Sequence, residues 1–138
     1  PTLFIWNDVG EPQVFEEPDG TMPRDLKNLN GDKHREWHNL YGMLLHRSTA
    51  EGLERRDQSN GPSHRPFVLS RSFFAGSQRY GAFWTGDNTA NWGYLAASTQ
   101  MLLGLNVGAF SFVGADVGGF FDNPDAELFT RWMQVGAY

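Results

Sequence analysis

The stretch that decides the fold is PFVLSRSFFAGSQRYGAFWTGDN, which runs from Pro66 to Asn88. It contains two short apolar segments; a charged residue follows each of them, Arg71 in the first case and Asp87 in the second. The same arrangement occurs in the opening TLFIWND, which ends on Asp8, and in FSFVGAD, which ends on Asp116. In barrels of parallel strands the residues just past the strand ends face the substrate, so this recurrence predicts a catalytic rim.

The rest of the chain alternates between predicted strands and predicted helices. We expect strands over residues 2–6, 67–70, 80–84 and 107–113, helices over 32–56 and 91–105, an irregular helical turn over 74–78, and loops over 11–31 and 57–66. Apolar residues spaced three and four apart mark the helices, and clusters of Pro, Gly and polar residues mark the loops. This order predicts an α/β fold with parallel strands.

Two helix boundaries are predicted from capping residues. Gly104 is expected to end the helix over 91–105, whose inward face would include Trp92 and Leu103. A last helix is expected to begin at Asn123, because an N-cap residue followed by proline is typical of a helix start. The buried stripe of this helix would consist of Leu128, Phe129, Trp132 and Met133.

The length of the chain limits how much of a barrel it can form. The 138 residues are 40 % apolar and 14 % aromatic, which suits a folded core. A complete (β/α)8 barrel takes about 250 residues, so at most half of one is expected here. We therefore expect residues 1–138 to be a fragment of a single catalytic TIM-barrel domain. Alone, such a fragment would have unpaired sheet edges and an incomplete pocket, so we expect it to be inactive.

Composition argues against several classes of protein. A net charge of −5 without a clustered basic face disfavours nucleic acid as a partner. The sequence has no apolar run of about 18 residues, so no membrane-spanning segment is expected, and without cysteine it has no disulfides. His34 and His38 are four residues apart, but HREWH lacks the glutamate position of the metalloprotease motif and a third ligand. No metal site and no cofactor are therefore predicted.

Three segments carry a family resemblance. IWNDVGEPQVF, SRSFFAGSQRYGAFWTGDN and GADVGGFF, in this order and spacing, resemble the retaining α-glucosidases of glycoside hydrolase family 31. The middle segment is most similar to the branch of that family that trims glucose from N-linked glycans. The resemblance covers nearly the whole chain and implies that it forms strands four to seven of the family's TIM barrel.

The resemblance also implies a role for each residue that matches a family motif. Asp8 matches the nucleophile and Asp87 the general acid/base. The positions that match the substrate pocket are Arg71, Trp84, Asp116, Phe120 and Val9. The family usually has Met-Asn directly after the nucleophile, where this chain has Val9 and Gly10. Val9 keeps an apolar pocket wall, whereas Gly10 lacks the amide side chain.

The chemistry of retention gives an independent reason to single out the two aspartates. One carboxylate must be ionised to attack the anomeric carbon and the other protonated to donate to the leaving oxygen, at a separation of roughly 5–6 Å. Arg71 near Asp8 would favour the ionised form there, and Trp84 beside Asp87 the protonated form. Aromatic faces also suit the apolar C–H face of a sugar.

Each of these residues has a structural interpretation as well. A strand-end aspartate taken alone is more often a helix N-cap, and Arg71 taken alone is a surface or ion-pair residue. The motifs favour catalysis for Asp8 and Asp87 and leave Asp116 open between a pocket role and a structural one. Glu11 could be a third catalytic carboxylate, but its position before Pro12 favours a loop anchor.

The sequence therefore predicts a retaining α-glucosidase that hydrolyses terminal α-linked glucose from oligosaccharides. By resemblance, the substrate would be an N-linked glycan, the partner a non-catalytic β subunit, and the location the lumen of the endoplasmic reticulum. One alternative is another α-glycosidase of the same family, of maltase type or an α-xylosidase. A non-catalytic carbohydrate-binding protein is the alternative from another class, against which the intact Asp8 and Asp87 argue.

Overall fold

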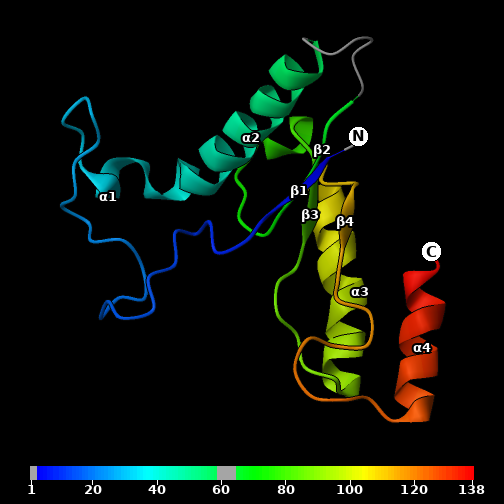
Figure 1. The fold of residues 1–138 in the computed structure, drawn as a ribbon. Helices are drawn as coiled ribbons and strands as arrows, with labels where there is room; N and C mark the ends of the chain where they lie inside the picture. The colour runs from blue at the N-terminus through cyan, green and yellow to red at the C-terminus, as the bar shows by residue number, and fades with distance from the viewer. Residues whose placement is uncertain (1–2, 59–64) are drawn as a thin grey trace. The chain divides into compact units, whose positions relative to one another are not determined.

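The structure, a computed structural model, describes residues 3–58 and 65–138 and divides into two compact units (Figure 1). Unit 1 is Pro1–Ala82 and unit 2 is Phe83–Tyr138, and each is described by itself. The loop predicted over 57–66 lies largely outside the described residues. That the whole chain belongs to one catalytic domain stays a prediction.

Unit 1 is built on two parallel strands and a long helix. Strand β1 (Phe4–Asn7) pairs in parallel with β2 (Phe67–Ser70), with Ile5 opposite Val68. Helix α2 (Tyr41–Gln58) lies against both strands, as parallel strands require of their crossover connection (Figure 1). The apolar residues packed between helix and strands are Ala50, Leu53 and Val68, with Ile5 and Tyr80 at the edge. This confirms the predicted strand–helix–strand order.

The helix predicted over 32–56 is interrupted near its start. It consists of α1 (His34–Trp37), the 3₁₀ helix η1 (His38–Leu40) and α2. The backbone of Trp37, with φ −132° and ψ 12°, leaves the helical conformation at the break.

A histidine pair lies at this break. The ring of His34 is fully buried, and its Nε2 lies 2.7 Å from Nδ1 of His38. Burial, and secondly the charge of His38, lower the pKa of His34. Among the described residues no group of three or more potential metal ligands gathers here or elsewhere.

The predicted loop over 11–31 is confirmed. Two isolated antiparallel bridges organise it, one between Gln13 and Thr21 and the other between Lys27 and Lys33. At its tip Oδ1 of Asn28 accepts hydrogen bonds from the backbone of Asn30 and of Asp32, both at 2.9 Å. The tip is therefore closed by its own hydrogen bonds, and Leu29 on it is fully exposed.

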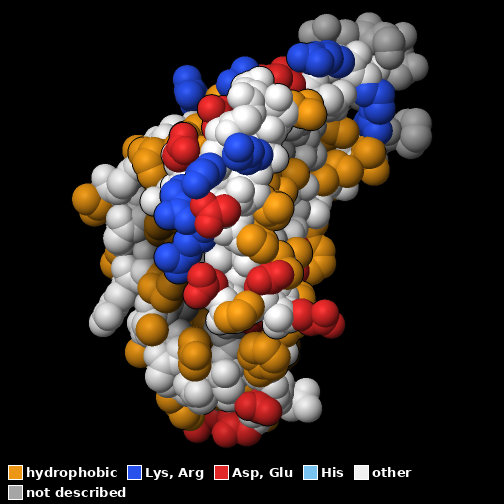
Figure 2. All heavy atoms as spheres, turned by 90° about the vertical axis from the view of Figure 1, so that its left-hand side faces the viewer, with side chains coloured by type: hydrophobic (Ala, Val, Ile, Leu, Met, Phe, Trp, Pro, Cys, Tyr) orange, Lys and Arg blue, Asp and Glu red, His pale blue; other side chains and the backbone are white. Residues whose placement is uncertain are grey.

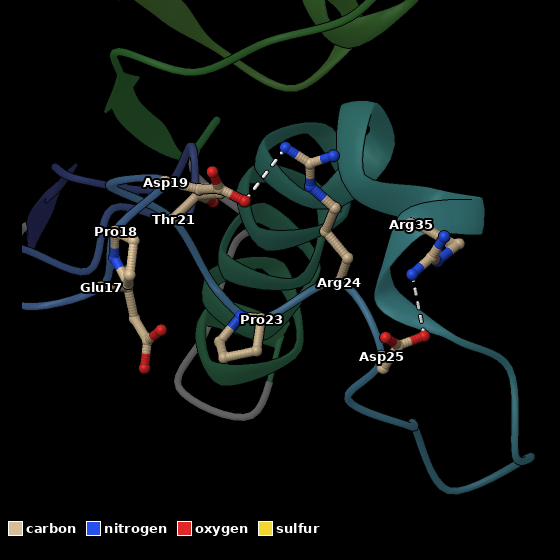
Figure 3. A pocket seen from close by; sticks show the side chains of 8 residues that line it. All are labelled: Glu17, Pro18, Asp19, Thr21, Pro23, Arg24, Asp25 and Arg35. Carbon is tan, nitrogen blue, oxygen red and sulfur yellow. Dashed lines mark hydrogen bonds and ion pairs between the residues drawn. The ribbon is translucent and has the colours of Figure 1, made fainter.

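Ion pairs fasten this loop to itself and to α1. Arg24 pairs with Asp19 at 3.0 Å, and Asp25 pairs with Lys33 at 3.0 Å and with Arg35 at 2.9 Å. The hydrogen bond from Lys33 and the charge of Arg35 lower the pKa of Asp25. Basic and acidic side chains lie next to one another on the face drawn in Figure 2. A hollow of about 330 Å³ lies among these groups, and Figure 3 shows its mixed lining.

Unit 2 continues the parallel pattern. Strand β3 (Ala82–Trp84) pairs with β4 (Val113–Gly114), so that Phe83 lies opposite Val113. The turn predicted before β3 is confirmed as the 3₁₀ helix η2 (Ser77–Arg79), which belongs to unit 1. Helix α3 (Trp92–Val107) lies against β4 and is capped by Asn91, whose side chain accepts a hydrogen bond from the backbone N–H of Tyr94, the third residue of the helix.

The predicted boundary between α3 and β4 is wrong. Gly104 does not end the helix, which continues to Val107, and the strand predicted over 107–113 is only Val113–Gly114. A turn closes the helix instead, because Phe110 donates to the carbonyl of Leu105 at 2.9 Å. Of the residues predicted as a strand, Gly108 and Ala109 therefore lie in this turn, Val107 belongs to α3, and Val113 is in β4.

The predicted faces of the last two helices also need correction. Trp92 and Leu103 of α3 are 49 % and 63 % exposed rather than buried, because α3 is apolar around most of its circumference and its pattern selects no face. Helix α4 (Ala126–Gly136) is capped by Asp125 and not by Asn123, since Oδ1 of Asp125 accepts from the third helical residue at 2.8 Å.

The buried stripe of α4 is narrower than predicted. Leu128 and Trp132 are buried, whereas Phe129 and Met133 are half exposed. Among the described residues, none of the helices combines the length and apolarity needed to cross a membrane.

Two glycines of α2 give a matched test of its packing. A Cβ added at Gly42 would lie 2.5 Å from Cβ and 2.9 Å from the carbonyl carbon of Ser72, whereas one at Gly52 would meet no atom of the described residues outside its own helix within 4 Å. We expect Gly42→Ala to lower the free energy of unfolding by about 1–3 kcal/mol, because α2 must move away from Ser72.

Gly52→Ala is the control. It should raise stability by about 0.5–1 kcal/mol, since alanine favours the helix without a clash. Melting temperatures of the two variants in the full-length protein test this, and shifts in the same direction would contradict the packing described.

Candidate active site

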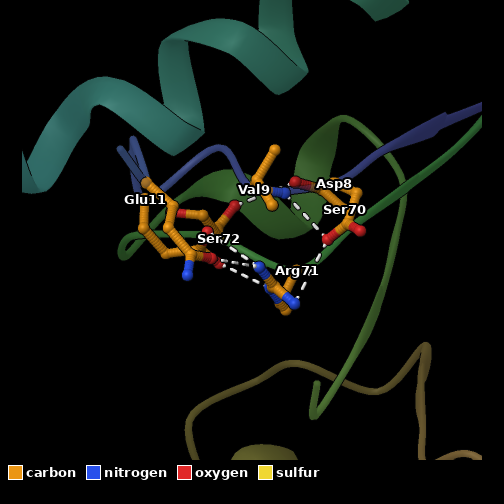
Figure 4. A network of polar contacts seen from close by, with 7 residues as sticks. Asp8, Val9, Glu11, Ser70, Arg71 and Ser72 are labelled. Atoms are coloured by element: carbon orange, nitrogen blue, oxygen red, sulfur yellow. Dashed lines mark hydrogen bonds and ion pairs between the residues drawn. The ribbon is translucent and has the colours of Figure 1, made fainter. Parts of the chain in front are cut away.

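Asp8 and Arg71 meet at the ends of two neighbouring strands. The register pairs Asn7 with Ser70, so that the next residue of each strand, Asp8 or Arg71, comes out at the same edge. Nη1 of Arg71 lies 3.3 Å from Oδ1 of Asp8, as Figure 4 shows. The backbone N–H of Arg71 also donates to the carbonyl of Asn7 at 3.4 Å. The contact predicted between this arginine and this carboxylate is confirmed.

Glu11 holds the other edge of the same guanidinium. Nε of Arg71 donates to Oε1 of Glu11 at 2.8 Å, and Nη2 donates to Oε2 at 3.3 Å. Nη2 also donates to Oε1 of Gln13 at 3.1 Å. The Arg71 side chain is only 16 % exposed and that of Glu11 is 40 % exposed, so the charge-assisted bonds between them are partly shielded from water. Glu11 is thus the loop anchor that the sequence predicted, and Gln13 is an anchor that the sequence analysis missed.

The turn that carries Asp8 is strained. Val9 has a φ of 50°, which a β-branched residue rarely adopts. The Val9 N–H donates to Oδ1 of Asp8 at 2.8 Å, and the Val9 carbonyl accepts from the N–H of Gln13 at 3.0 Å. Next to it Gly10 is buried, and a Cβ there would lie 3.0 Å from Cδ2 of Leu45. Packing and hydrogen bonds therefore fix the direction of the Asp8 side chain.

In unit 2, the polar residue that follows a strand end is Asp87, which comes after Trp84 at the end of β3. β3 ends at Trp84, which is buried, and Asp87 follows three residues later with an exposed side chain. Between them Thr85 donates to the carbonyl of Gly114 at 3.0 Å and so extends the pairing with β4. Gly86 has a φ of 89°, which a side chain would strain, and the chain turns there.

Asn88 joins the ends of β3 and β4. Its Nδ2 donates to the carbonyl of Asp116 at 3.1 Å, and its Oδ1 accepts from the N–H of Phe120 at 2.9 Å. Its own carbonyl accepts from the N–H of Phe121 at 2.9 Å. Asn88 is buried, and the sequence analysis missed it; its place directly after Asp87 is the signal that could have identified it.

The loop after β4 packs tightly on this asparagine. Asp116 is half-buried, and its carbonyl accepts from Gly119 at 3.3 Å. Gly119 has a φ of 99°, and a Cβ there would lie 2.6 Å from the backbone nitrogen of Ala90. Phe120, 55 % exposed, contacts the edge of Phe121 with the ring centroids 4.8 Å apart. This loop therefore needs glycine where it touches the turn after β3.

The predicted site residues thus form two groups. In unit 1 the structure brings together Asp8, Val9 and Arg71. In unit 2 Trp84, Asp87, Asp116 and Phe120 lie at or beyond the ends of β3 and β4. The separation of roughly 5–6 Å expected between the carboxyl groups of Asp8 and Asp87 concerns both units and stays a prediction.

Comparison with known proteins gives a match over the whole chain. Residues 1–138 match the sequence profile of the glycosyl hydrolases family 31 TIM-barrel domain. This confirms the predicted fold class, part of a (β/α)8 barrel. Which of the barrel's strands the chain supplies stays a prediction.

Similar proteins come from animals and plants. The chain is 55 % identical over 138 residues to neutral alpha-glucosidase AB of Homo sapiens, and it spans 14 % of that protein. It is also 55 % identical to a probable glucan 1,3-alpha-glucosidase of Oryza sativa subsp. japonica, of which it spans 15 %. All of the chain is covered in both comparisons.

A solved structure is similar as well. It is the crystal structure of the ER glucosidase II heterodimeric complex, which consists of the catalytic subunit and the binding domain of the regulatory subunit. The TM-score is 0.93 at 55 % identity, with 98 % of this chain and 14 % of that chain covered. The chain is thus similar to a small part of much longer proteins.

Asn88→Ala tests how the rim of unit 2 is held together. The change removes two side-chain hydrogen bonds and leaves the Asp116 carbonyl with the longer bond from the Gly119 N–H at 3.3 Å, so we expect a loss of about 1–3 kcal/mol in the free energy of unfolding. Amide hydrogen exchange over residues 116–121 of the full-length protein should accelerate, because the loop loses its attachment.

The matched control is Asn106→Ala. It removes an exposed bond to the carbonyl of Leu102 in α3 and should change stability by less than about 0.5 kcal/mol. Equal exchange over residues 116–121 in both variants would show that Asn88 does not hold the loop.

Proposed function

Because the chain belongs to glycosyl hydrolase family 31, we propose that the protein containing it is a retaining α-glucosidase. It removes terminal α-linked glucose from oligosaccharides. The observation that carries this proposal is the pairing of Asp8 with Arg71 at adjacent strand ends, in a chain that matches the family over its full length. A carboxylate fixed next to a cation at a barrel rim has what a nucleophile of this reaction requires.

The reaction proceeds by two displacements. In the first, a carboxylate oxygen of Asp8 attacks the anomeric carbon, and Asp87 gives its proton to the leaving oxygen as the glycosidic bond breaks. In the second, Asp87 takes a proton from water, whose oxygen displaces Asp8 from the glucosyl intermediate. Two inversions at the same carbon give net retention.

The remaining residues of the two groups match pocket positions of the family, and the proposal gives each of them a role toward the terminal glucose. Arg71 donates hydrogen bonds to the sugar or to the nucleophile that attacks it, and Asp116 accepts hydrogen bonds from sugar hydroxyls. Phe120, which is 55 % exposed, supplies aromatic surface to the C–H face of the ring, whereas the buried Trp84 supports the strand end that leads to Asp87. Val9 forms an apolar wall next to Asp8.

The natural substrate in this proposal is an N-linked glycan, and the type of enzyme is glucosidase II. Its support is the 55 % identity with neutral alpha-glucosidase AB and the likeness to ER glucosidase II. The same likeness supports a regulatory β subunit as partner and the lumen of the endoplasmic reticulum as location. An α-glucosidase acting on other glucans is the second candidate, favoured by the identity with the rice glucan 1,3-alpha-glucosidase.

Asp8→Ala in the full-length protein tests the nucleophile. We expect kcat for an aryl α-glucoside to fall by more than about 10³-fold, since no covalent intermediate can form. Azide should restore part of the turnover and yield a β-glucosyl azide, because the anion enters from the face that Asp8 has left. Asp25→Ala, which removes a carboxylate paired with Lys33 and Arg35 on the long loop, is the control and should keep full activity.

Asp87→Ala tests the acid. Its loss should slow the cleavage of glucosides with poor leaving groups far more than that of activated aryl glucosides, because only the former need protonation of the departing oxygen. The measurement is kcat/KM across a series of leaving groups. An equal loss along the series would assign Asp87 a different role.

A further inference from the structure

Glu11 uses both carboxylate oxygens on one arginine. Oε1 accepts from Nε and Oε2 from Nη2 of Arg71, at 2.8 and 3.3 Å. Because Arg71 engages both oxygens, the structure argues against a role for Glu11 as a third catalytic carboxylate. Its effect on chemistry must therefore pass through the guanidinium that it holds.

The geometry of a guanidinium makes that effect specific. The group is planar, and its donors point in fixed directions, so two bonds at the Nε–Nη2 edge determine where Nη1 points. In this chain Nη1 points at Asp8, with 3.3 Å between Nη1 and Oδ1 (Figure 4). Gln13 adds a third acceptor on Nη2 at 3.1 Å. The loop residues Glu11 and Gln13 therefore fix the orientation of the Arg71 guanidinium, and this orientation directs Nη1 toward Asp8.

We propose that Glu11 is a positioning residue for Asp8. It orients the guanidinium of Arg71 and also pairs with its positive charge, so that Arg71 aligns Asp8 without forming its whole ion-pair interaction with Asp8. The inference rests on the proposed function. A carboxylate that took the whole interaction with an arginine would be stabilised in the ground state and would attack more slowly, whereas one shared with Glu11 remains reactive. Gln13 is a neutral acceptor, so its hydrogen bond helps to orient the Arg71 guanidinium without adding a negative charge.

The test is Glu11→Gln in the full-length protein. The amide keeps the shape of the side chain but presents an NH₂ donor or a single oxygen to two donors of Arg71. We expect kcat per active site to fall by about 10–100-fold, because reacting groups tolerate little displacement, and KM to change less than kcat. Active sites are counted by covalent trapping with a fluoro-glucoside, so misfolded protein does not enter the rate.

Glu51→Gln is the matched control. It removes another arginine–carboxylate contact of unit 1, from Nε of Arg47 to Oε1 of Glu51 at 2.6 Å on α2, where the Arg47 side chain is 51 % exposed. Its kcat per trapped site should equal that of the unaltered protein. An equal loss in both variants would show that any lost ion pair of unit 1 has this effect and would overturn the proposal.

Rescue separates positioning from a merely structural role. Adding Gln13→Glu to the Glu11→Gln variant returns a carboxylate to Nη2 of Arg71 and should recover kcat by about threefold or more. A double variant no faster than the single one, or a single variant within about threefold of the unaltered protein, refutes the positioning role.

Two further outcomes are decisive as well. If Glu11→Gln gives no trappable protein, Gln13→Leu replaces it, with an expected loss of about threefold in kcat per site; an unchanged kcat would overturn the proposal. If the unaltered protein neither turns over the glucoside nor is trapped, the proposed function itself fails. If it does both and the variants are unaffected, only the present inference fails.

Discussion

The guanidinium of Arg71 is the group on which the rim of unit 1 depends. It connects two segments of chain, since its partner Glu11 is 60 residues away in sequence. Without this cation Asp8 and Glu11, three residues apart in one strained turn, would be two like charges with no common partner. The rim of unit 2 uses other means: the buried Asn88 joins its two strand ends through amide and backbone hydrogen bonds.

The contact between Asp8 and Arg71 could be predicted because the register of two parallel strands brings the residues after them together. Once two strands of one sheet run side by side, the residues that follow them must emerge together, which is why Asp8 and Arg71 were paired correctly. Asn88 and Gln13 could not be predicted in this way. A side chain that bonds to a backbone carbonyl or to one edge of an arginine leaves no periodic pattern in the sequence.

The fold was less predictable where two local patterns compete. The apolar run from Gly104 to Val113 suits the end of a helix as well as a strand, and the turn within it depends on Ala109, whose φ of 67° nothing in the sequence signals. At the start of α4, Asn123 and Asp125 are both good caps. Only the position of the third helical N–H decides between them, and that is a property of the folded chain.

The tip of the loop over 11–31 is closed by its own hydrogen bonds, so the length of the loop can change without moving Glu11 at its base. Asn28 and Asp32 complete the turn between themselves, and the side chain of Leu29 at the tip is fully exposed. Doubling such a loop costs only about 0.6 kcal/mol in closure entropy. The tip is consequently a place where insertions can accumulate during evolution, or where a fluorophore or an affinity tag can be attached, while the strand ends keep their positions.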